Sequence, residues 1–301
     1  MYIEKPEVKA QRGTENKWKQ LDCCATIKTH SSREVIKMHV MKLFDLTGKV
    51  AVVTGGAGKY GSPMVEALAE AGATVVVASR NLEKNEAFAE SFRQKKLKVY
   101  AECYDQGDEA SILALRDRLV ESYGRVDVLV NNSALRGCFS GGFDGGTMEG
   151  FARSLAVNGA GLFILSRALG NVMAEQGSGS IINIGSYMGN LGPNEPLYEG
   201  TDGMSALGSP DYFYHKSGMH NLTRFLAANY GPKGIRCNCL ALGGLFANQH
   251  PAFVENCSKA TYLGRLANEE DVKGMIVYLA SDASAYLTGT VIPLDGGYSA
   301  K

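Results

Sequence analysis

The stretch VAVVTGGAGKYG, residues 50–61, joins a β-branched run to the amphipathic segment Ser62–Ala71. Its last glycines follow the spacing G-x-G-x-x-G between a predicted strand and a predicted helix. A dinucleotide pyrophosphate needs backbone that it can approach closely and free N–H groups at a helix N-terminus. The alternative is a tight turn that serves packing alone. We favour a dinucleotide site that includes Gly55, Gly56, Gly58, Lys59, Tyr60 and Gly61.

Short apolar runs alternate with helical segments over residues 41–301, which suits parallel strands covered on both faces. This alternation predicts one doubly wound, Rossmann-like α/β domain with a mostly parallel sheet of about seven strands and helices on both faces. Residues 1–40 form a polar extension, expected to be disordered apart from a short helix around Ser32–Met41. The expected strands are Val50–Thr54, Thr74–Ala78, Lys98–Glu102, Val126–Asn131, Ser180–Ile184, Ile235–Leu240 and Thr290–Leu294.

Composition excludes several classes of function. The 31 basic and 31 acidic residues cancel, which argues against binding to nucleic acid or to an acidic membrane surface. No window approaches the roughly 20 apolar residues of a membrane span, and no secretory signal is evident. The seven cysteines lack metal-site spacing, so we expect no metal and a cytoplasmic protein with reduced, buried thiols.

The end of the second strand selects the cofactor. An acidic side chain there would bind the adenosine 2′-hydroxyl, but the sequence has Ser79 and Arg80. Arg80 can pair with a 2′-phosphate, and Lys59 adds positive charge in the glycine turn. We therefore expect NADP(H) in preference to NAD(H). The alternative is that Arg80 is a solvated surface charge.

Tyr212 and Lys216 form Y-x-x-x-K, a spacing that places both side chains on one helix face. A neighbouring ammonium stabilises a phenolate, which suits a tyrosine for general acid–base chemistry near neutral pH. Tyr187, Tyr198 and Tyr214 lack a lysine four residues later. The pattern alone is common, so it gains meaning only with the rest of the chain.

Residues 41–301 resemble the short-chain dehydrogenase/reductase family. The motifs occur in the family's order: Thr54–Gly61, NNSA at 131–134, Asn158, Ser186, Tyr212–Lys216, Asn238 and LDGG at 294–297. The resemblance implies that Tyr212 exchanges a proton with the substrate oxygen, which Ser186 hydrogen-bonds. It also implies that Lys216 holds the nicotinamide ribose and that Asn158 holds a water. Strand capping by Ser186 and a helix kink at Asn158 are the alternatives.

The same resemblance extends to the rest of the cofactor. Asp105 and Gln106 match positions that touch the adenine. Asn132, followed by Ser133, matches the residue that stabilises the central sheet beside the cofactor, and Leu245 is expected to contact the carboxamide. Self-association as a homodimer or homotetramer is implied as well.

Three departures from the family pattern bear on function. Lys59 replaces a glycine of the turn, and Leu242-Gly243 and Ala247 alter the loop expected to frame the nicotinamide. The polar insertion Gly189–Pro210 lies between Ser186 and Tyr212 and favours a hydroxylated substrate over an acyl chain, although a solvent loop is equally compatible. Residues His250–Leu263 are expected to form a lid.

The sequence thus predicts an NADP-dependent oxidoreductase that interconverts a small-molecule alcohol and ketone. A weaker resemblance to members that act on sugars or sugar acids, carried by Gly243–Gln249 and Leu263–Arg265, favours a sugar-like or polyol substrate. Two alternatives stay open: a 3-oxoacyl thioester reductase, and a catalytically inactive dinucleotide-binding regulator.

Overall fold

The computed structural model describes residues 38–139, 143–205, 207 and 209–300. The expected disorder of residues 1–40 and the helix Ser32–Met41 therefore fall largely outside the described residues; within them, a short 3-10 helix covers Val40–Phe44. Residues His39–Lys301 form one compact unit.

Seven strands form one sheet in the order β3-β2-β1-β4-β5-β6-β7, and every pair is parallel. The predicted doubly wound fold is confirmed, and each predicted strand is present within one or two residues at either end. The strands are β1 Val50–Thr54, β2 Thr74–Ser79, β3 Val99–Cys103, β4 Val128–Asn131, β5 Gly179–Ser186, β6 Ile235–Leu242 and β7 Val291–Leu294.

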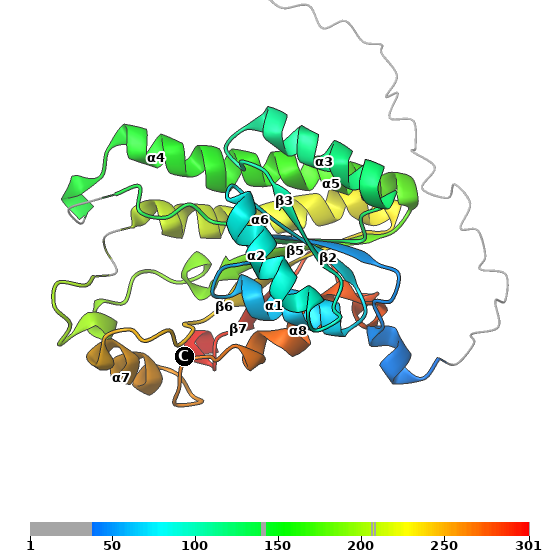
Figure 1. Ribbon diagram of the computed structural model, residues 1–301. Helices are drawn as coiled ribbons and strands as arrows, with labels where there is room; N and C mark the ends of the chain where they lie inside the picture. Colours follow the sequence, from blue (N-terminus) through cyan, green and yellow to red (C-terminus); the bar gives the residue numbers. More distant parts are fainter. Residues whose placement is uncertain (1–37, 140–142, 206, 208, 301) are drawn as a thin grey trace, which may run out of the picture. The chain divides into compact units, whose positions relative to one another are not determined.

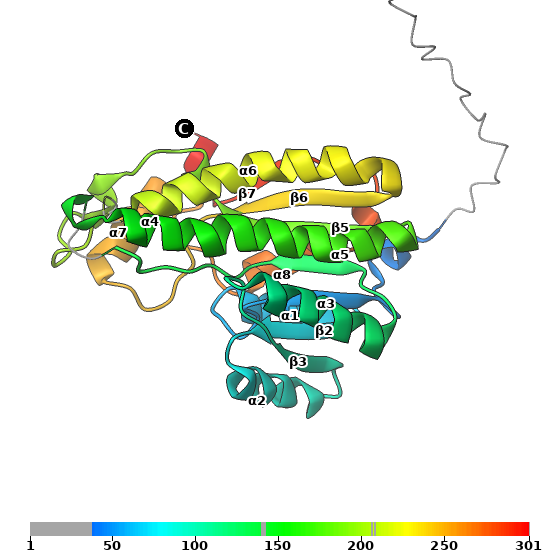
Figure 2. The same cartoon turned by 90° about the horizontal axis from the view of Figure 1, so that it is seen from above.

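Helices cover both faces of the sheet, with α1, α2 and α8 on one side and α3 to α6 on the other (Figures 1 and 2). Helix α7 lies near the carboxyl end of the sheet, away from both layers. The helices are α1 Gly61–Glu70, α2 Leu82–Arg93, α3 Glu109–Tyr123, α4 Met148–Leu155, α5 Leu162–Gln176, α6 Pro210–Tyr230, α7 Pro251–Ala260 and α8 Glu270–Ala280.

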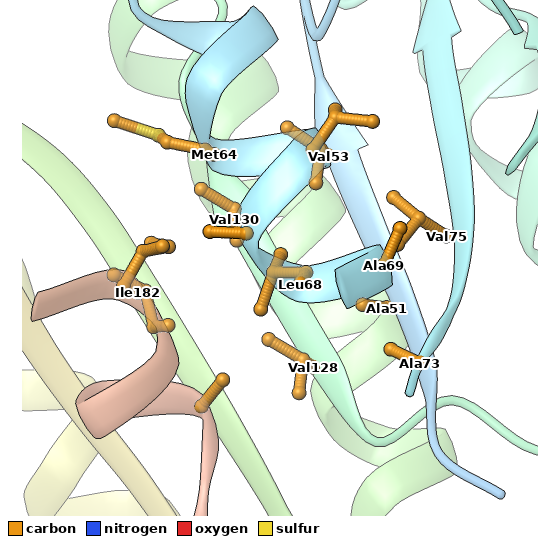
Figure 3. Close-up of a cluster of buried hydrophobic side chains, with 14 of the residues drawn as sticks. Ala51, Val53, Met64, Leu68, Ala69, Ala73, Val75, Val128, Val130 and Ile182 are labelled. Carbon is orange, nitrogen blue, oxygen red and sulfur yellow. The ribbon is translucent and has the colours of Figure 1, made fainter. Parts of the chain in front are cut away.

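Alternation along the strands divides the apolar core between the two layers. Val53 faces α1 and packs with Met64 and Leu68 (Figure 3). Its neighbour Val52 faces the opposite layer, with Leu165 of α5. Because each strand is buried on both faces, its residues are apolar almost without interruption, as parallel sheets require.

One helical segment is longer and more apolar than the sequence analysis allowed. Met148–Gln176 runs through α4, a π-helical stretch at Ala156–Gly161 and α5, and by length and composition alone it could cross a membrane. Its residues Leu165, Leu169 and Met173 are buried in the core. The expectation that no stretch approaches a membrane span is therefore wrong by hydropathy. Packing of this segment against the core accounts for its apolar residues.

The strand order reverses between β1 and β4. In open parallel sheets, ligands bind at such a switch point, beyond the carboxyl ends of the strands. The fold therefore directs attention to the loops after Thr54, Ser79, Asn131 and Ser186.

Candidate active site

A cleft of about 850 Å³ opens at the switch point, within the size range of small-molecule and cofactor sites. It contains most of the residues predicted to bind the cofactor. Those lining it are Gly55, Gly58, Lys59, Tyr60, Ser79, Arg80, Asp105, Gln106, Asn132, Ser133, Tyr212 and Lys216.

Gly56, Gly61 and Leu245 were also predicted, but they do not line this cleft. A Cβ on Gly61 would lie 2.4 Å from the Gly55 carbonyl oxygen, and one on Gly56 would lie 2.9 Å from Val65 and Val77. These two glycines therefore serve close packing between the turn, α1 and the sheet. Leu245 lies in a second, adjoining pocket.

The glycine turn suits an anion. Helix α1 begins at Gly61 with no side-chain cap and no acidic residue in its first turn, so its N-terminal dipole faces the cleft unopposed. The Tyr60 hydroxyl donates to the Gly243 carbonyl at 2.7 Å and links the turn to the loop after β6. These features fit the pyrophosphate of a dinucleotide.

Of the two side chains at the end of β2, one is hydrogen-bonded within the protein and the other can bind a ligand. The Ser79 hydroxyl donates to Asn85 Oδ1 at 2.8 Å, whereas Arg80 is exposed and forms no ion pair among the described residues. Asp105 also lines the cleft, but its Oδ1 accepts the Gly107 amide at 2.8 Å in a tight turn. Arg80 is thus available to a ligand's phosphate.

Hydrogen bonds tie β1 to β4 beneath the cleft. The Asn132 side chain donates to the carbonyls of Thr54 and Gly55 at 2.9 and 3.1 Å. The Thr54 hydroxyl accepts the amides of Asn132 and Ser133 at 3.0 and 2.9 Å. Asn132 therefore has the geometry that the family resemblance implies for it.

The buried amides of Gln106 and Asn158 are bonded within the protein. Gln106 donates to the Val157 carbonyl at 2.9 Å. Asn158 sits in the π-helical stretch and binds the backbone of Leu135 twice, accepting from its N–H at 2.7 Å and donating to its carbonyl at 2.9 Å. The Asn158 side chain thus fixes the loop after β4, and a water held here would need another atom of the residue.

Tyr212 and Lys216 lie on successive turns of α6, as their spacing predicts. The Lys216 Nζ lies 5.7 Å from the Tyr212 ring centre and donates to the Ile184 carbonyl at 2.6 Å. Only 4% of Lys216 is exposed. This burial, opposed by Cys239 and assisted by the positive charge of Arg136, lowers the pKa of Lys216 to about 8.

Ser186 lies at the end of β5 and, like Tyr212, lines both the cleft and an adjoining pocket of about 500 Å³. Its hydroxyl accepts the Met188 amide at 3.2 Å, so the capping alternative and a catalytic role are compatible. The hydroxyl proton stays available to a substrate oxygen. Ser186 and Tyr212 line both cavities, which is where a reacting carbon would contact cofactor and protein together.

Arg136 was missed by the sequence analysis. Its Nη2 donates to the Tyr212 hydroxyl at 3.0 Å, and its guanidinium carbon lies 4.6 Å from the ring centre. The only available signal was a cation two residues after the NNSA motif, which has no distinctive spacing. Its loop lies 76 residues from Tyr212 in sequence and meets it only in the folded chain.

A buried polar cluster behind Tyr212 was also missed. The Ser154 hydroxyl donates to Asp211 at 2.6 Å and accepts from Asn158 at 3.1 Å. His215 packs edge-on against the Tyr212 ring, and burial, with help from Lys216, lowers its pKa to about 4. His215 is therefore neutral at physiological pH and adds no competing cation to the site.

The insertion Gly189–Pro210 and helix α7 together form the outer wall of the pocket. Leu197 of the insertion packs with Cys257 of α7, and the Asn256 side chain donates to the Glu199 carbonyl at 2.9 Å. Tyr198 and Ser205 of the insertion and Phe253 of α7 line the pocket from this wall. The insertion is thus anchored to α7 through Leu197 and Glu199, while most of its described residues are exposed, as a solvent loop would be.

The remaining predicted features differ in how they fit the structure. Tyr187 and Tyr198 line the pocket, and burial raises the pKa of both, whereas Tyr214 is exposed. Cys103 is exposed, so uniformly buried thiols were a wrong expectation. Within the described ranges, no three or more His, Cys, Asp or Glu side chains gather as a metal site would need.

Comparison with known proteins places this geometry in a family. A family model described as enoyl-(acyl carrier protein) reductase matches residues 60–299. The chain is 28% identical to D-threitol dehydrogenase of Mycolicibacterium smegmatis over 86% of this chain and 95% of that protein. It is 34% identical to a 3-alpha-(or 20-beta)-hydroxysteroid dehydrogenase of Mycobacterium bovis over 84% and 90%.

A solved structure shows the same fold. Gluconate 5-dehydrogenase from Burkholderia cenocepacia, in complex with NADP and tartrate, superposes with a TM-score of 0.78 and 28% identity, covering 87% of this chain and all of that one. The ordered motifs, the parallel sheet and these relatives agree with one another. The chain belongs to the short-chain dehydrogenase/reductase family and is an oxidoreductase that acts on CH–OH groups.

Proposed function

We propose that this protein is an NADP(H)-dependent dehydrogenase that interconverts an alcohol and a ketone on a polyol or sugar-like substrate. One observation carries the proposal: Ser186 and Tyr212 stand where the dinucleotide cleft meets the smaller pocket, with Lys216 behind them. That junction can hold a nicotinamide and a small carbonyl compound in contact with the same tyrosine hydroxyl.

The chain's own groups position the substrate oxygen and move its proton. Ser186 donates a hydrogen bond to that oxygen, and the Tyr212 hydroxyl gives or takes the proton as a general acid or base. Arg136 donates a hydrogen bond to the tyrosine hydroxyl, and the Lys216 ammonium lies 5.7 Å from the centre of the tyrosine ring. The nicotinamide, when bound, supplies or accepts the hydride at C4.

Two observations support NADP(H) over NAD(H). Arg80 lies at the end of β2 without an ion pair among the described residues, and Lys59 lines the same cleft. No carboxylate occupies the last positions of β2, where one would repel a 2′-phosphate. The structural relative from Burkholderia cenocepacia was solved with NADP.

The Arg80→Asp variant tests this preference. We expect its NADPH Kd to rise at least about tenfold while its NADH Kd changes little, because a charge-assisted pair to phosphate is lost. Lys84→Asp is the matched control, since Lys84 is exposed nearby but does not line the cleft. Equal NADPH Kd values for wild type and Arg80→Asp would reject Arg80 as the phosphate-binding residue.

The pocket supports a hydroxylated substrate. Ser186, Ser209 and Tyr198 line it with hydroxyl groups that can bind substrate hydroxyls. Gln249 also lines it but bonds to the backbone of Leu245 and Ala247, and the Ser205 hydroxyl donates to Glu195. D-threitol dehydrogenase and gluconate 5-dehydrogenase are relatives whose names agree with this class. A panel of ketoses and polyols, followed by NADPH absorbance, tests it directly.

A 3-oxoacyl thioester reductase is the second candidate, because the matching family model is described as a reductase that acts on another class of acyl-carrier thioester. Acetoacetyl thioester belongs in the same panel, and faster turnover of it than of every ketose and polyol would favour this reading. An inactive regulator would bind NADPH yet reduce nothing in the panel. We further propose that the protein is a cytoplasmic homodimer or homotetramer without nucleic-acid or membrane partners, which light scattering and fractionation can test.

A further inference from the structure

Arg136 occupies the boundary between the dinucleotide cleft and the substrate pocket and lines both. Its position is fixed from one side, because Asn158 clamps the N–H and carbonyl of the preceding residue, Leu135. It is fixed from the other side by the contact of its guanidinium with the Tyr212 hydroxyl and ring. Although Arg136 is exposed, its guanidinium is therefore placed beside the Tyr212 hydroxyl.

The guanidinium has binding capacity to spare. It carries five N–H donors, and the contact with Tyr212 uses one of them. Across residues 38–139, 143–205, 207 and 209–300, Arg136 forms no ion pair with a carboxylate. A planar guanidinium with free, adjacent donors matches a carboxylate in a two-point contact.

No carboxylate near the pocket forms an ion pair with Arg136 among the described residues, although Glu195 acts on Tyr198 with the opposite sign. Its lining includes one acidic residue, Asp211, which is buried and accepts the Ser154 hydroxyl at 2.6 Å. Lys59 lines the same pocket and adds a second positive charge. The positive charge of Arg136 also acts on Tyr60, Tyr198 and Lys216, which surround the pocket or lie just behind it. Two carboxylates near the pocket are each hydrogen-bonded to a serine, Asp211 to Ser154 and Glu195 to Ser205, so Arg136 and Lys59 keep their capacity to bind an anionic ligand.

We propose that Arg136 recognises a carboxylate of the substrate, so that the preferred substrates are hydroxy acids or sugar acids rather than neutral polyols. This inference rests on the proposed dehydrogenase function and names its substrate class. Because the same guanidinium contacts the Tyr212 hydroxyl, the carboxylate lies within a few carbon atoms of the reacting carbon. Oxidation leaves the carboxylate intact: the hydroxyl proton passes to Tyr212 and the hydride to NADP⁺, giving a keto acid.

The test uses acids and alcohols of matched length, namely tartrate with threitol and galactonate with galactitol. In the wild type we expect kcat/KM for the acid to exceed that for the alcohol by at least about tenfold. In Arg136→Gln this ratio should fall by at least about tenfold, chiefly through a higher KM for the acid. Arg136→Lys should give an intermediate ratio, since it keeps the charge and loses the two-point contact.

Arg153→Gln is the matched control, because Arg153 lines the dinucleotide cleft but not the substrate pocket. It should leave the acid-to-alcohol ratio as in the wild type. Two results would overturn the proposal: equal preference for acid and alcohol in the wild type, or an equal loss for both in Arg136→Gln. A parallel rise in the NADPH Kd of Arg136→Gln would assign the arginine to the cofactor instead.

Binding measurements separate this proposal from the proposed dehydrogenase activity. Calorimetry of tartrate and galactonate with the NADPH-loaded protein needs no turnover. Binding to the wild type that is lost in Arg136→Gln, with no turnover of any pair, would refute the activity and leave carboxylate recognition standing. Turnover of the neutral polyols alone, with no acid bound by the wild type, would refute carboxylate recognition and leave the dehydrogenase activity standing.

Discussion

The two cavities that meet at Tyr212 are built in different ways. The dinucleotide cleft is bounded by strand ends and by the glycine turn. Polar side chains that line it, such as Asn132 and Gln106, bond to the protein itself. The substrate pocket is bounded by the insertion and helix α7, and it displays hydroxyl groups and the unpaired charge of Arg136. The cleft is defined by backbone shape, and the pocket by side-chain chemistry.

This difference indicates which of the two cavities can accept substitutions without loss of folding. Where backbone atoms form the wall of the cleft, an added Cβ displaces the backbone, so folding stability and cofactor affinity should both decrease. A pocket made of side chains can change its ligand while the sheet stays intact. Substitutions in the two cavities should therefore differ in whether they change stability, cofactor binding or substrate turnover.

Tyr212→Phe should produce the largest effect, because it removes the group that exchanges the proton at the junction. We expect kcat to fall by about 100- to 10,000-fold, the usual contribution of general acid–base catalysis, with little change in the NADPH Kd. Tyr214→Phe is the control, since Tyr214 is exposed on the same helix. Wild-type kcat in Tyr212→Phe would exclude the tyrosine mechanism.

Lys216→Met should change the pH dependence of stability. In the folded protein the pKa of Lys216 is about 8, below its unfolded value of 10.5, so between these pH values the unfolded chain binds a proton that the folded chain lacks. Stability of the wild type relative to the variant should therefore rise by up to about 3 kcal/mol as the pH increases through this window.

Chemical denaturation at both ends of the window measures this difference, and groups common to both proteins cancel. Below the window the difference should be constant. A wild-type advantage that falls with increasing pH would contradict burial as the main cause of the shift.

Gly61→Ala should displace the backbone of the glycine turn beside the cleft. The new Cβ meets backbone atoms of Gly55 and Gly56 within 2.7 Å, and neither can move without shifting the turn. We expect a loss of about 1–3 kcal/mol in the free energy of unfolding, together with weaker NADPH binding. Gly274→Ala in α8, where a Cβ meets nothing within 4 Å, should instead stabilise the protein slightly. Similar effects of the two substitutions would show that the turn is not tightly packed.

Asn256→Ala should give the smallest effect, confined to the pocket. It removes the hydrogen bond that joins α7 to the Glu199 carbonyl of the insertion. A loss of about 1 kcal/mol in ordering this wall should raise the substrate KM about fivefold, with an unchanged NADPH Kd. Asn171→Ala, which loses a hydrogen bond to Tyr230 away from the cavities, should leave KM unchanged. A larger change in NADPH affinity than in KM would mean that the wall supports the cleft instead.

The sequence predicted the fold well because local patterns encode it, and the same kind of pattern placed Tyr212 and Lys216 together. Val50–Thr54 is apolar throughout because both faces are buried, and Tyr212 and Lys216 share a helix face because four residues make about one turn. Gly56 and Gly61 do not line the cleft, and a Cβ on either would meet neighbouring atoms within 3 Å, since glycine spacing alone does not separate packing from contact. The contact of Leu245 with the nicotinamide stays a prediction, and Leu245 lines the pocket of about 500 Å³.

By itself, the sequence determined the parallel sheet, the position of the glycine turn and the shared helix face of Tyr212 and Lys216, because periodicity and fixed spacing act over short distances along the chain. The role of Ser186 came from the family resemblance. Only the tertiary structure brought Arg136 to the Tyr212 hydroxyl, used the Asn158 amide to hold Leu135, and packed the insertion against α7. These contacts join segments far apart in sequence, and they exist because burial of the shared core brings those segments together.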